Sequence, residues 1–160
     1  MGVFGSASLL FPQFEDNVFA HIKPLRLNTV GDTSVARDQQ ITGLFQSFIA
    51  KRNTDKPFFS FLFYDAVHNY CEGSSSEHMS PFHPAIAECK RFSLTAHTDP
   101  TPYRNRYHNA AYFLDQQAEK VIQTLKHKGL FKNTIVVVTA DHGEQQNDQH
   151  MNYWSHASAY

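Results

Sequence analysis

The chain has 160 residues, of which 41% are hydrophobic and 18% are charged, and its formal net charge is −1 at pH 7. This length and composition are typical of one globular domain with a sizeable core. The balanced charge argues against a nucleic-acid-binding protein, because such domains usually carry a concentrated basic surface. Neither a transmembrane helix nor a signal peptide is predicted, since no long apolar run and no basic segment with an apolar core are present.

The first part of the chain predicts a strand, a helix and a second strand. A short strand is expected up to about Phe4. A helix is predicted next, with Asp38 as its cap and with apolar residues at three- and four-residue spacing along one buried face. That face consists of Ile41, Leu44, Phe45, Phe48 and Ile49. The aromatic run 58–64 then predicts a buried strand, which leads directly into Asp65 and His68.

Residues 69–102 are rich in Ser, Pro, His and charge and show no long periodic pattern. We therefore expect an insertion or lid-like loop there, in which a short helix around residues 85–91 would fit. The loop contains both cysteines of the chain, Cys71 and Cys89. A disulfide and two unpaired thiols are equally consistent with a count of two, and a disulfide would require an oxidising compartment.

The last part of the chain predicts a long helix followed by a strand. From Tyr103 onward, apolar residues recur at helical spacing at Tyr107, Ala111, Leu114, Ala118, Val121, Ile122 and Leu125. Cations in the final turn and a left-handed Gly129 are expected to end this helix. The β-branched run 134–139 then predicts a buried strand. The order of elements predicts an α/β fold with a mostly parallel sheet flanked by helices.

Polar side chains follow the ends of two predicted strands. Asp141 and His142 come directly after the last strand, where Gly143 would permit the chain to bend. Their oxygen and nitrogen donors suit one divalent metal ion. A capping Asp, a surface His and a turn Gly explain the same residues equally well. His156 returns from a polar loop, with Trp154 as a packing anchor, and is a candidate for a second metal position or an anion contact.

Further candidates lie near these residues. Asp65 and His68 follow the other strand, and carboxyl ends of neighbouring parallel strands are where α/β proteins assemble their sites. Asp65 is expected to support the ligands rather than to bind the ion itself. Glu144 is expected either to hold an imidazole through its second nitrogen or to be a solvated charge. Arg104 and Arg106 are expected to be solvated at the start of the long helix, outside the site.

Residues 132–144, together with Trp154, Ser155 and His156, resemble the carboxyl-side metal motif of sulfatases and phosphoethanolamine transferases in the alkaline phosphatase superfamily. Within that superfamily, residues 2–5, 57–68 and the helix from 105 onward are most similar to the periplasmic domain of YejM (PbgA)-type inner-membrane proteins. The resemblance spans nearly the whole chain. It implies that residues 1–160 are the carboxyl-side portion of one sulfatase-like domain, incomplete at both ends.

The resemblance also implies a chemistry. Asp141, His142 and His156 match metal ligands for zinc, calcium, magnesium or manganese, and His68 and His156 match substrate-binding histidines. The family attacks phosphate or sulfate esters with a metal-activated hydroxyl and forms a covalent intermediate. In the YejM branch the implied location is the periplasmic face of the inner membrane, with the membrane reached through a region outside this chain. The alternative function implied by that branch is a non-catalytic sensor that binds anionic lipid in lipopolysaccharide homeostasis.

Several positions depart from the family pattern. Nothing in the chain matches the nucleophilic Thr, Ser or modified Cys, and Cys71 lacks the Pro and Arg of the Cys-x-Pro-x-Arg signature. We therefore expect the chain by itself to have negligible phosphatase or sulfatase activity. Val67 replaces a commoner Pro, and Ser155 and Ala157 flank a histidine that more often lies between glycines. None of these changes removes a proposed ligand.

Overall fold

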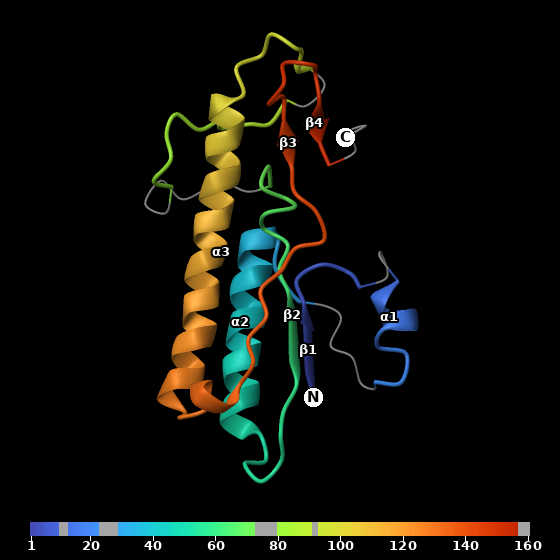
Figure 1. Cartoon of the computed structure of the whole chain (residues 1–160), viewed down its shortest axis with the longest axis vertical. Coiled ribbons are helices and arrows are strands. Elements are labelled where there is room, and N and C mark those ends of the chain that lie inside the picture. The colour runs from blue at the N-terminus through green and yellow to red at the C-terminus, as the bar shows by residue number, and fades with distance from the viewer. Residues whose placement is uncertain (10–12, 23–28, 73–79, 91–92, 157–160) are drawn as a thin grey trace.

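The computed structural model describes residues 1–9, 13–22, 29–72, 80–90 and 93–156. Two long helices lie side by side against a small parallel sheet, and a separate hairpin lies near the start of the longer helix (Figure 1). In chain order the elements are β1 (Gly2–Gly5), α1 (Phe14–Asn17), α2 (Ser34–Lys51), β2 (Ser60–Phe63), α3 (Thr101–His127), a 3-10 turn (Phe131–Asn133), β3 (Gln145–Gln146) and β4 (Trp154–Ser155).

The sheet formed by β1 and β2 confirms the predicted α/β class. The two strands run parallel, in a register that pairs Gly2 with Ser60 and Gly5 with Phe63. Helix α2 connects them, which is the crossover that parallel neighbours need. The prediction of strands near Phe4 and within residues 58–64 is thus confirmed, although β2 is half-buried rather than fully buried.

The main core lies between this sheet and the two long helices. Ile41, Phe45 and Ile49 of α2 are buried, and the other two residues of the predicted face, Leu44 and Phe48, pack against them. Phe4 of β1 and Leu125 of α3 complete the buried cluster. The apolar periodicity of α2 therefore identified the side chains that hold the sheet and helices together.

The predicted start of α2 was wrong. The helix begins at Ser34, and the N-cap is Thr33, whose hydroxyl accepts a hydrogen bond from the Ala36 amide at 3.1 Å. Asp38 lies one turn inside the helix and is completely buried. Its two carboxylate oxygens accept hydrogen bonds from the amides of Asp65 and Ala66, at 3.0 and 2.9 Å. Thr33 has the extended backbone that a capping residue needs, which leaves Asp38 available to anchor a distant loop.

Helix α3 confirms the long helix that was predicted from Tyr103 onward. Its end has the expected left-handed Gly129, at φ 67°, and paired hydrogen bonds from the amides of Gly129 and Leu130 to the carbonyls of Lys126 and Leu125. Among the described residues, no helix combines the length and the apolar character that crossing a membrane requires.

The buried face of α3 differs from the predicted one. Of the predicted apolar positions only Leu125 is fully buried, whereas the polar residues Arg106, Asn109 and Gln117 are. Residues 80–90, which contain no helix, lie along the first half of α3, and the Asn109 side chain exchanges two hydrogen bonds with the Phe82 backbone. Polar side chains are buried there because they bind the backbone of an irregular segment.

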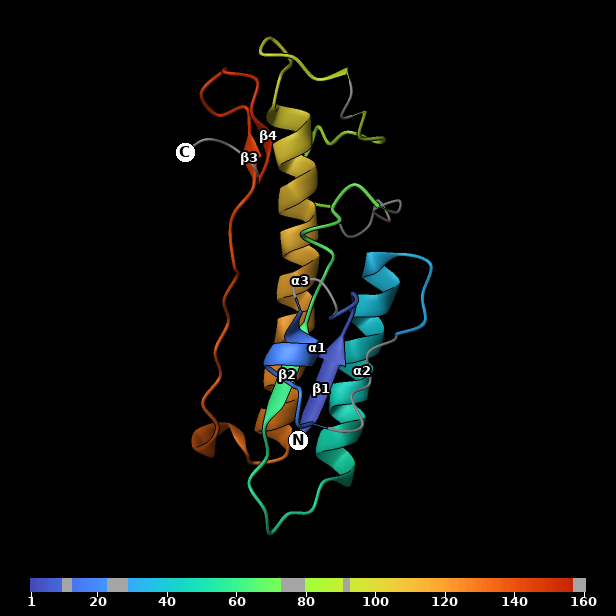
Figure 2. The same ribbon diagram turned by 90° about the vertical axis from the view of Figure 1, so that its right-hand side faces the viewer.

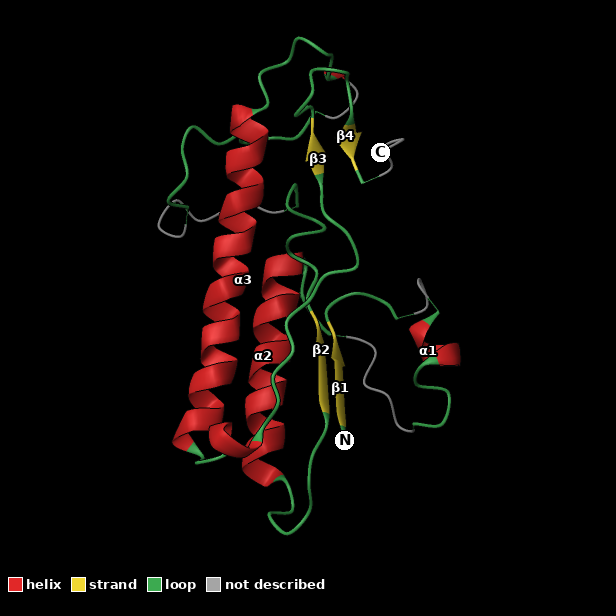
Figure 3. Ribbon diagram, in the orientation of Figure 1, coloured by secondary structure: helices red, strands yellow, loops and turns green. Residues whose placement is uncertain are grey.

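The prediction of a buried strand at residues 134–139 was wrong. The segment runs in an extended path beside the core but belongs to no sheet (Figure 3). Figure 2 shows it standing apart from β1 and β2. Ile135, Val137 and Val138 are 92%, 77% and 83% exposed. β-Branched residues favour an extended backbone, but a strand needs a hydrogen-bonded neighbour, and the described residues supply none here.

Candidate functional site

The hairpin of β3 and β4 places two of the predicted site residues opposite each other. Its antiparallel register pairs Gln145 with Ser155 and Gln146 with Trp154. Continuing that register by one position sets Glu144 against His156, and Glu144 Oε2 lies 3.7 Å from His156 Nδ1. Trp154 packs its ring against Tyr103 of α3, with centroids 5.3 Å apart. The pairing of β3 with β4 therefore explains why Glu144 and His156 lie close together.

Asn147 organises the turn between β3 and β4. This residue is almost fully buried and has a left-handed backbone, with φ of 54°. Its side chain donates to the Ala96 carbonyl at 3.0 Å and accepts from the Asn152 amide at 2.8 Å. We did not predict this role of Asn147 from the sequence. The residue type could have indicated it, because asparagine tolerates the left-handed region and forms hydrogen bonds to nearby backbone.

Three predicted histidines lie close together. His156 stacks on His142 with ring centroids 4.5 Å apart, and its ring centroid lies 5.7 Å from that of His68. His68 comes from the loop after β2, His142 from the end of the extended segment, and His156 from the hairpin. All three are exposed. The fold thus brings together imidazoles from three separate parts of the chain at one accessible place.

Asp141 and His142 present two donor atoms to the same region. Asp141 Oδ2 lies 3.6 Å from His142 Nε2, a separation that two ligands bonded to one ion at about 2.0–2.2 Å can have. The Nδ1 atom of His142 lies 2.9 Å from the Gly143 carbonyl, which can only accept, so Nδ1 carries the proton and Nε2 the lone pair. Metal-binding histidines usually have this arrangement.

These two residues fit part of a ligand set rather than a whole one. Among the described residues, no three His, Cys, Asp or Glu side chains converge as a metal site. The expected role of Gly143 is also corrected. Its φ lies outside the left-handed region, and a Cβ there would meet open space, so the local bend does not require glycine.

Glu144 is the most enclosed acid next to the histidines. Its side chain is 12% exposed, against 79% for Asp141. The hydroxyl of Tyr70 donates to Glu144 Oε1 at 3.5 Å. The pKa of Tyr107 is raised, mainly by burial and further by the negative charge of Glu144. Glu144 therefore lies between tyrosines and His156.

Asp65, the other acid that we expected to support the ligands, is bound elsewhere. Its carboxylate accepts hydrogen bonds from Arg37 at 3.1 Å and from Asn69 at 2.7 Å. Its amide and that of Ala66 bind the buried Asp38, whose pKa burial raises to about 6. These contacts fix the start of the loop that carries His68. Asp65 thus shapes the loop's backbone.

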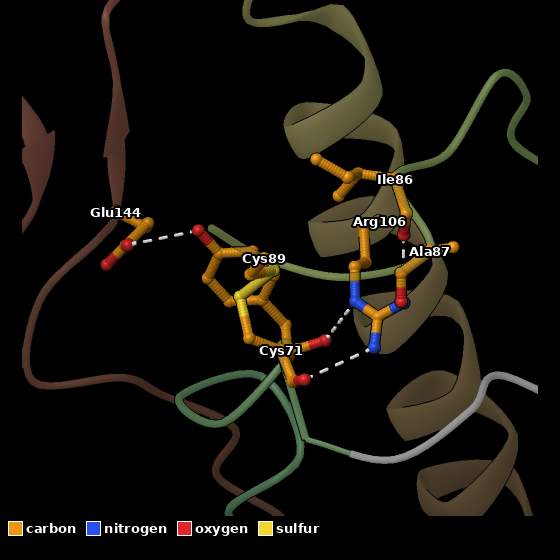
Figure 4. The surroundings of a disulfide bond; sticks show 7 residues. Cys71, Ile86, Ala87, Cys89, Arg106 and Glu144 are labelled. Carbon is orange, nitrogen blue, oxygen red and sulfur yellow. Dashed lines mark hydrogen bonds between the residues drawn. A yellow bond between two sulfur atoms is a disulfide. The ribbon is translucent and has the colours of Figure 1, made fainter. Parts of the chain in front are cut away.

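The far end of the same loop is fixed by Arg106 and by a disulfide (Figure 4). The disulfide joins Cys71 to Cys89, which decides between the two readings of the cysteine pair. Contrary to the prediction of a solvated side chain, Arg106 is buried and donates to backbone carbonyls on both sides of the disulfide. The acceptors are the carbonyls of Tyr70, Cys71, Ile86 and Ala87. Arg104, as expected, lies at the surface, paired with Asp148 at 2.8 Å.

The chain is an α/β protein in which histidines and carboxylates from separate segments lie close together. The sulfatase family model matches residues 13–160, which is most of the chain. The chain therefore belongs to the sulfatase family, within the alkaline phosphatase superfamily. No curated protein and no solved structure matches the chain significantly.

Proposed function

We propose that this chain carries one side of a metal-dependent site that acts on phosphate or sulfate esters. Membership of the sulfatase family supports hydrolase or transferase chemistry on such esters. The observation that carries the proposal is that Asp141 Oδ2 and His142 Nε2 lie 3.6 Å apart, and that the His142 ring stacks on His156. Their exposure leaves them accessible to an ion and a substrate.

Each side chain has a distinct part in this proposal. Asp141 Oδ2 and His142 Nε2 would hold a divalent ion, which when bound supplies positive charge against the ester's anionic oxygens. His156 faces Glu144 with Nδ1, so its Nε2 is the nitrogen available to the transferred group. The His68 ring lies 5.7 Å from that of His156 and could donate a hydrogen bond to an anionic oxygen.

We also propose that the domain works in an oxidising compartment, on the periplasmic face of a bacterial inner membrane. The Cys71–Cys89 disulfide supports this location, because disulfides persist in the periplasm and are rare in the cytosol. Thiol titration of the protein purified from periplasm under non-reducing conditions tests it. Two free thiols would contradict the proposed location.

The metal assignment can be tested by calorimetric titration of the full chain with Zn²⁺. His142→Ala should weaken Zn²⁺ binding at least about tenfold, because it removes a ligand nitrogen. His127→Ala is the matched control, since His127 is an exposed histidine in the last turn of α3, and it should leave the affinity unchanged. Equal loss in both variants would mean that the ion binds surface imidazoles without preference.

The chain by itself should not turn over an aryl phosphate, so robust turnover abolished by Asp141→Ala would overturn that expectation.

A second candidate is a non-catalytic domain of the YejM type that binds anionic lipid. The observation that favours it is that only part of a metal-ligand set converges among the described residues, while three imidazoles remain exposed together. Sedimentation with vesicles of phosphatidylglycerol, compared with phosphatidylcholine, separates the candidates. Selective sedimentation lost in His68→Ala and His156→Ala, without any Zn²⁺ binding at His142, would favour the lipid-binding function.

A further inference from the structure

Tyr70 connects the disulfide region to the histidine site. Its backbone carbonyl accepts a hydrogen bond from Arg106 Nε at 2.8 Å, and its hydroxyl reaches Glu144 Oε1 at 3.5 Å. Its ring stands edge-on to Tyr107 of α3, with centroids 5.6 Å apart. The backbone and the ring of Tyr70 are therefore both held, and its hydroxyl is the group directed at the site.

The backbone on either side of Tyr70 is fastened to α3. Arg106 binds the carbonyls of Tyr70 and Cys71 with one part of its guanidinium and those of Ile86 and Ala87 with another. The disulfide ties the same two segments together covalently (Figure 4). We call the Arg106 side chain together with the Cys71–Cys89 disulfide the clamp. A planar guanidinium with fixed donors is well suited to such multiple backbone contacts.

We propose that Tyr70 is a positioning residue of the site, held by the clamp and acting through Glu144 on His156. The hydroxyl of Tyr70 donates to one carboxylate oxygen of Glu144 at 3.5 Å, and the other oxygen lies 3.7 Å from His156 Nδ1, within ion-pair distance. Ser155 Oγ lies 3.4 Å from the same Nδ1. A carboxylate close to Nδ1 favours the tautomer that carries its proton on Nδ1 and has Nε2 as the acceptor. The consequence for ligand binding rests on the proposed function, whereas the effect on the His156 imidazole does not.

The imidazole of His156 gives the direct test, by ¹⁵N-detected NMR of the metal-free, full chain at about pH 8, where ordinary histidine is neutral. In the wild type we expect the His156 signals of a proton fixed on Nδ1. Tyr70→Phe should shift them toward a mixture of the two tautomers, and Glu144→Gln should do so more strongly. Tyr112→Phe, a change at an exposed tyrosine of α3, should leave them unaltered. An unchanged His156 spectrum in Tyr70→Phe would overturn the proposal.

The clamp is tested with the double variant Cys71→Ala, Cys89→Ala. If the disulfide serves stability alone, the variant unfolds at lower urea concentration but its folded form keeps the wild-type His156 signals. The proposal expects the folded form to show the same tautomer mixture as Tyr70→Phe. Arg106→Lys provides a second route to the same result, because lysine cannot bridge the four carbonyls.

Inorganic phosphate provides the ligand readout. Tyr70→Phe should raise its dissociation constant about two- to tenfold, because His156 Nε2 is then less often the acceptor that receives a hydrogen bond from the protonated oxygen of phosphate. If the wild type binds no phosphate, the proposed function fails, while the His156 spectra still decide the role of Tyr70. If phosphate binds equally to both proteins and the spectra are also equal, the positioning role fails and the proposed function stands.

Discussion

The loop after β2 and the segment after α3 make an instructive comparison. In each, a buried strand was predicted to end at an acid and a histidine: Asp65 and His68 in the loop after β2, and Asp141 and His142 in the segment after α3. In the structure the loop residue Asp65 is 5% exposed and tied to Arg37, whereas Asp141 is 79% exposed at the end of an unpaired segment. The two ends nevertheless meet at the histidines. One half of the proposed site is therefore fixed by buried hydrogen bonds and a disulfide, and the other is fixed chiefly by the hairpin that follows it.

The comparison shows what an apolar pattern does and does not determine. The β-branched run 134–139 fixes an extended backbone, but burial also needs a neighbouring strand. The loop after β2 owes its position to buried polar groups, Asp38 and Arg106, which bind its backbone at both ends. Such groups have no periodicity, so their role becomes visible only in three dimensions.

The largest expected effect is in the main core, against which β2 and α3 pack. Phe45→Ala should lower the free energy of unfolding by about 3–5 kcal/mol, because Phe45 is buried between the sheet and both long helices. Urea unfolding followed by circular dichroism measures this. Val136→Ala in the extended segment is the matched control and should have a far smaller effect. Similar losses at both positions would mean that the segment is packed as tightly as the core.

A pH dependence should arise from Asp38. Burial raises its pKa in the folded protein from 3.8 to about 6, and the nearby charge of Asp65 adds to that effect. The carboxyl therefore favours folding below about pH 4, and this contribution is lost as the pH rises through about 6, a change of about 3 kcal/mol. Relative to the wild type, Asp38→Asn should lack this decline in unfolding experiments between pH 4 and 7.

The control for Asp38 is Asp115→Asn, at an exposed position of α3. That variant should keep the wild-type pH dependence. The same slope in the wild type and in Asp38→Asn would show that the buried carboxyl titrates at its ordinary pKa.

A smaller effect, an increase in stability, is expected at Ser155 in the β3–β4 hairpin. Its φ of 140° lies in a region where side chains are rarely accommodated. Ser155→Gly should therefore raise the free energy of unfolding by about 1 kcal/mol. Ser158→Gly controls for a general effect of glycine near the carboxyl end of the chain. A loss of stability in Ser155→Gly would show that Ser155 is not strained.

The smallest effect is expected on the extended segment itself. Val137→Thr should change the free energy of unfolding by less than about 0.5 kcal/mol, because Val137 is 77% exposed and threonine has the same branched shape. A loss above about 1 kcal/mol in the unfolding experiment would mean that the side chain is buried in solution, as a strand of the sheet would be.

The sequence was most informative where apolar residues repeat. The face of α2, the length of α3 and the cap at Gly129 were all predictable, because helical periodicity and left-handed glycine have local causes. The histidines were recognisable from their positions after apolar runs and from their resemblance to a known motif. Whether they ligate a metal remains a prediction.

Other features depend on contacts between distant segments. Nothing local distinguishes the buried Arg106 from the exposed Arg104, since each lies in the first turns of α3 and only one meets the backbone of the insertion. The same holds for Tyr70, whose link to Glu144 spans 74 positions of the sequence. The pairing of Cys71 with Cys89 could be listed as an alternative but not chosen, because two cysteines also suit free thiols.

The central claim is that Asp141 and His142 hold a divalent ion beside His156. Anomalous diffraction at the zinc edge, from crystals of the full chain grown with Zn²⁺, tests it most directly. We predict one strong peak about 2.0–2.2 Å from both Asp141 Oδ2 and His142 Nε2. A zinc ion bound only at other side chains, with these two atoms far from it, would contradict the account.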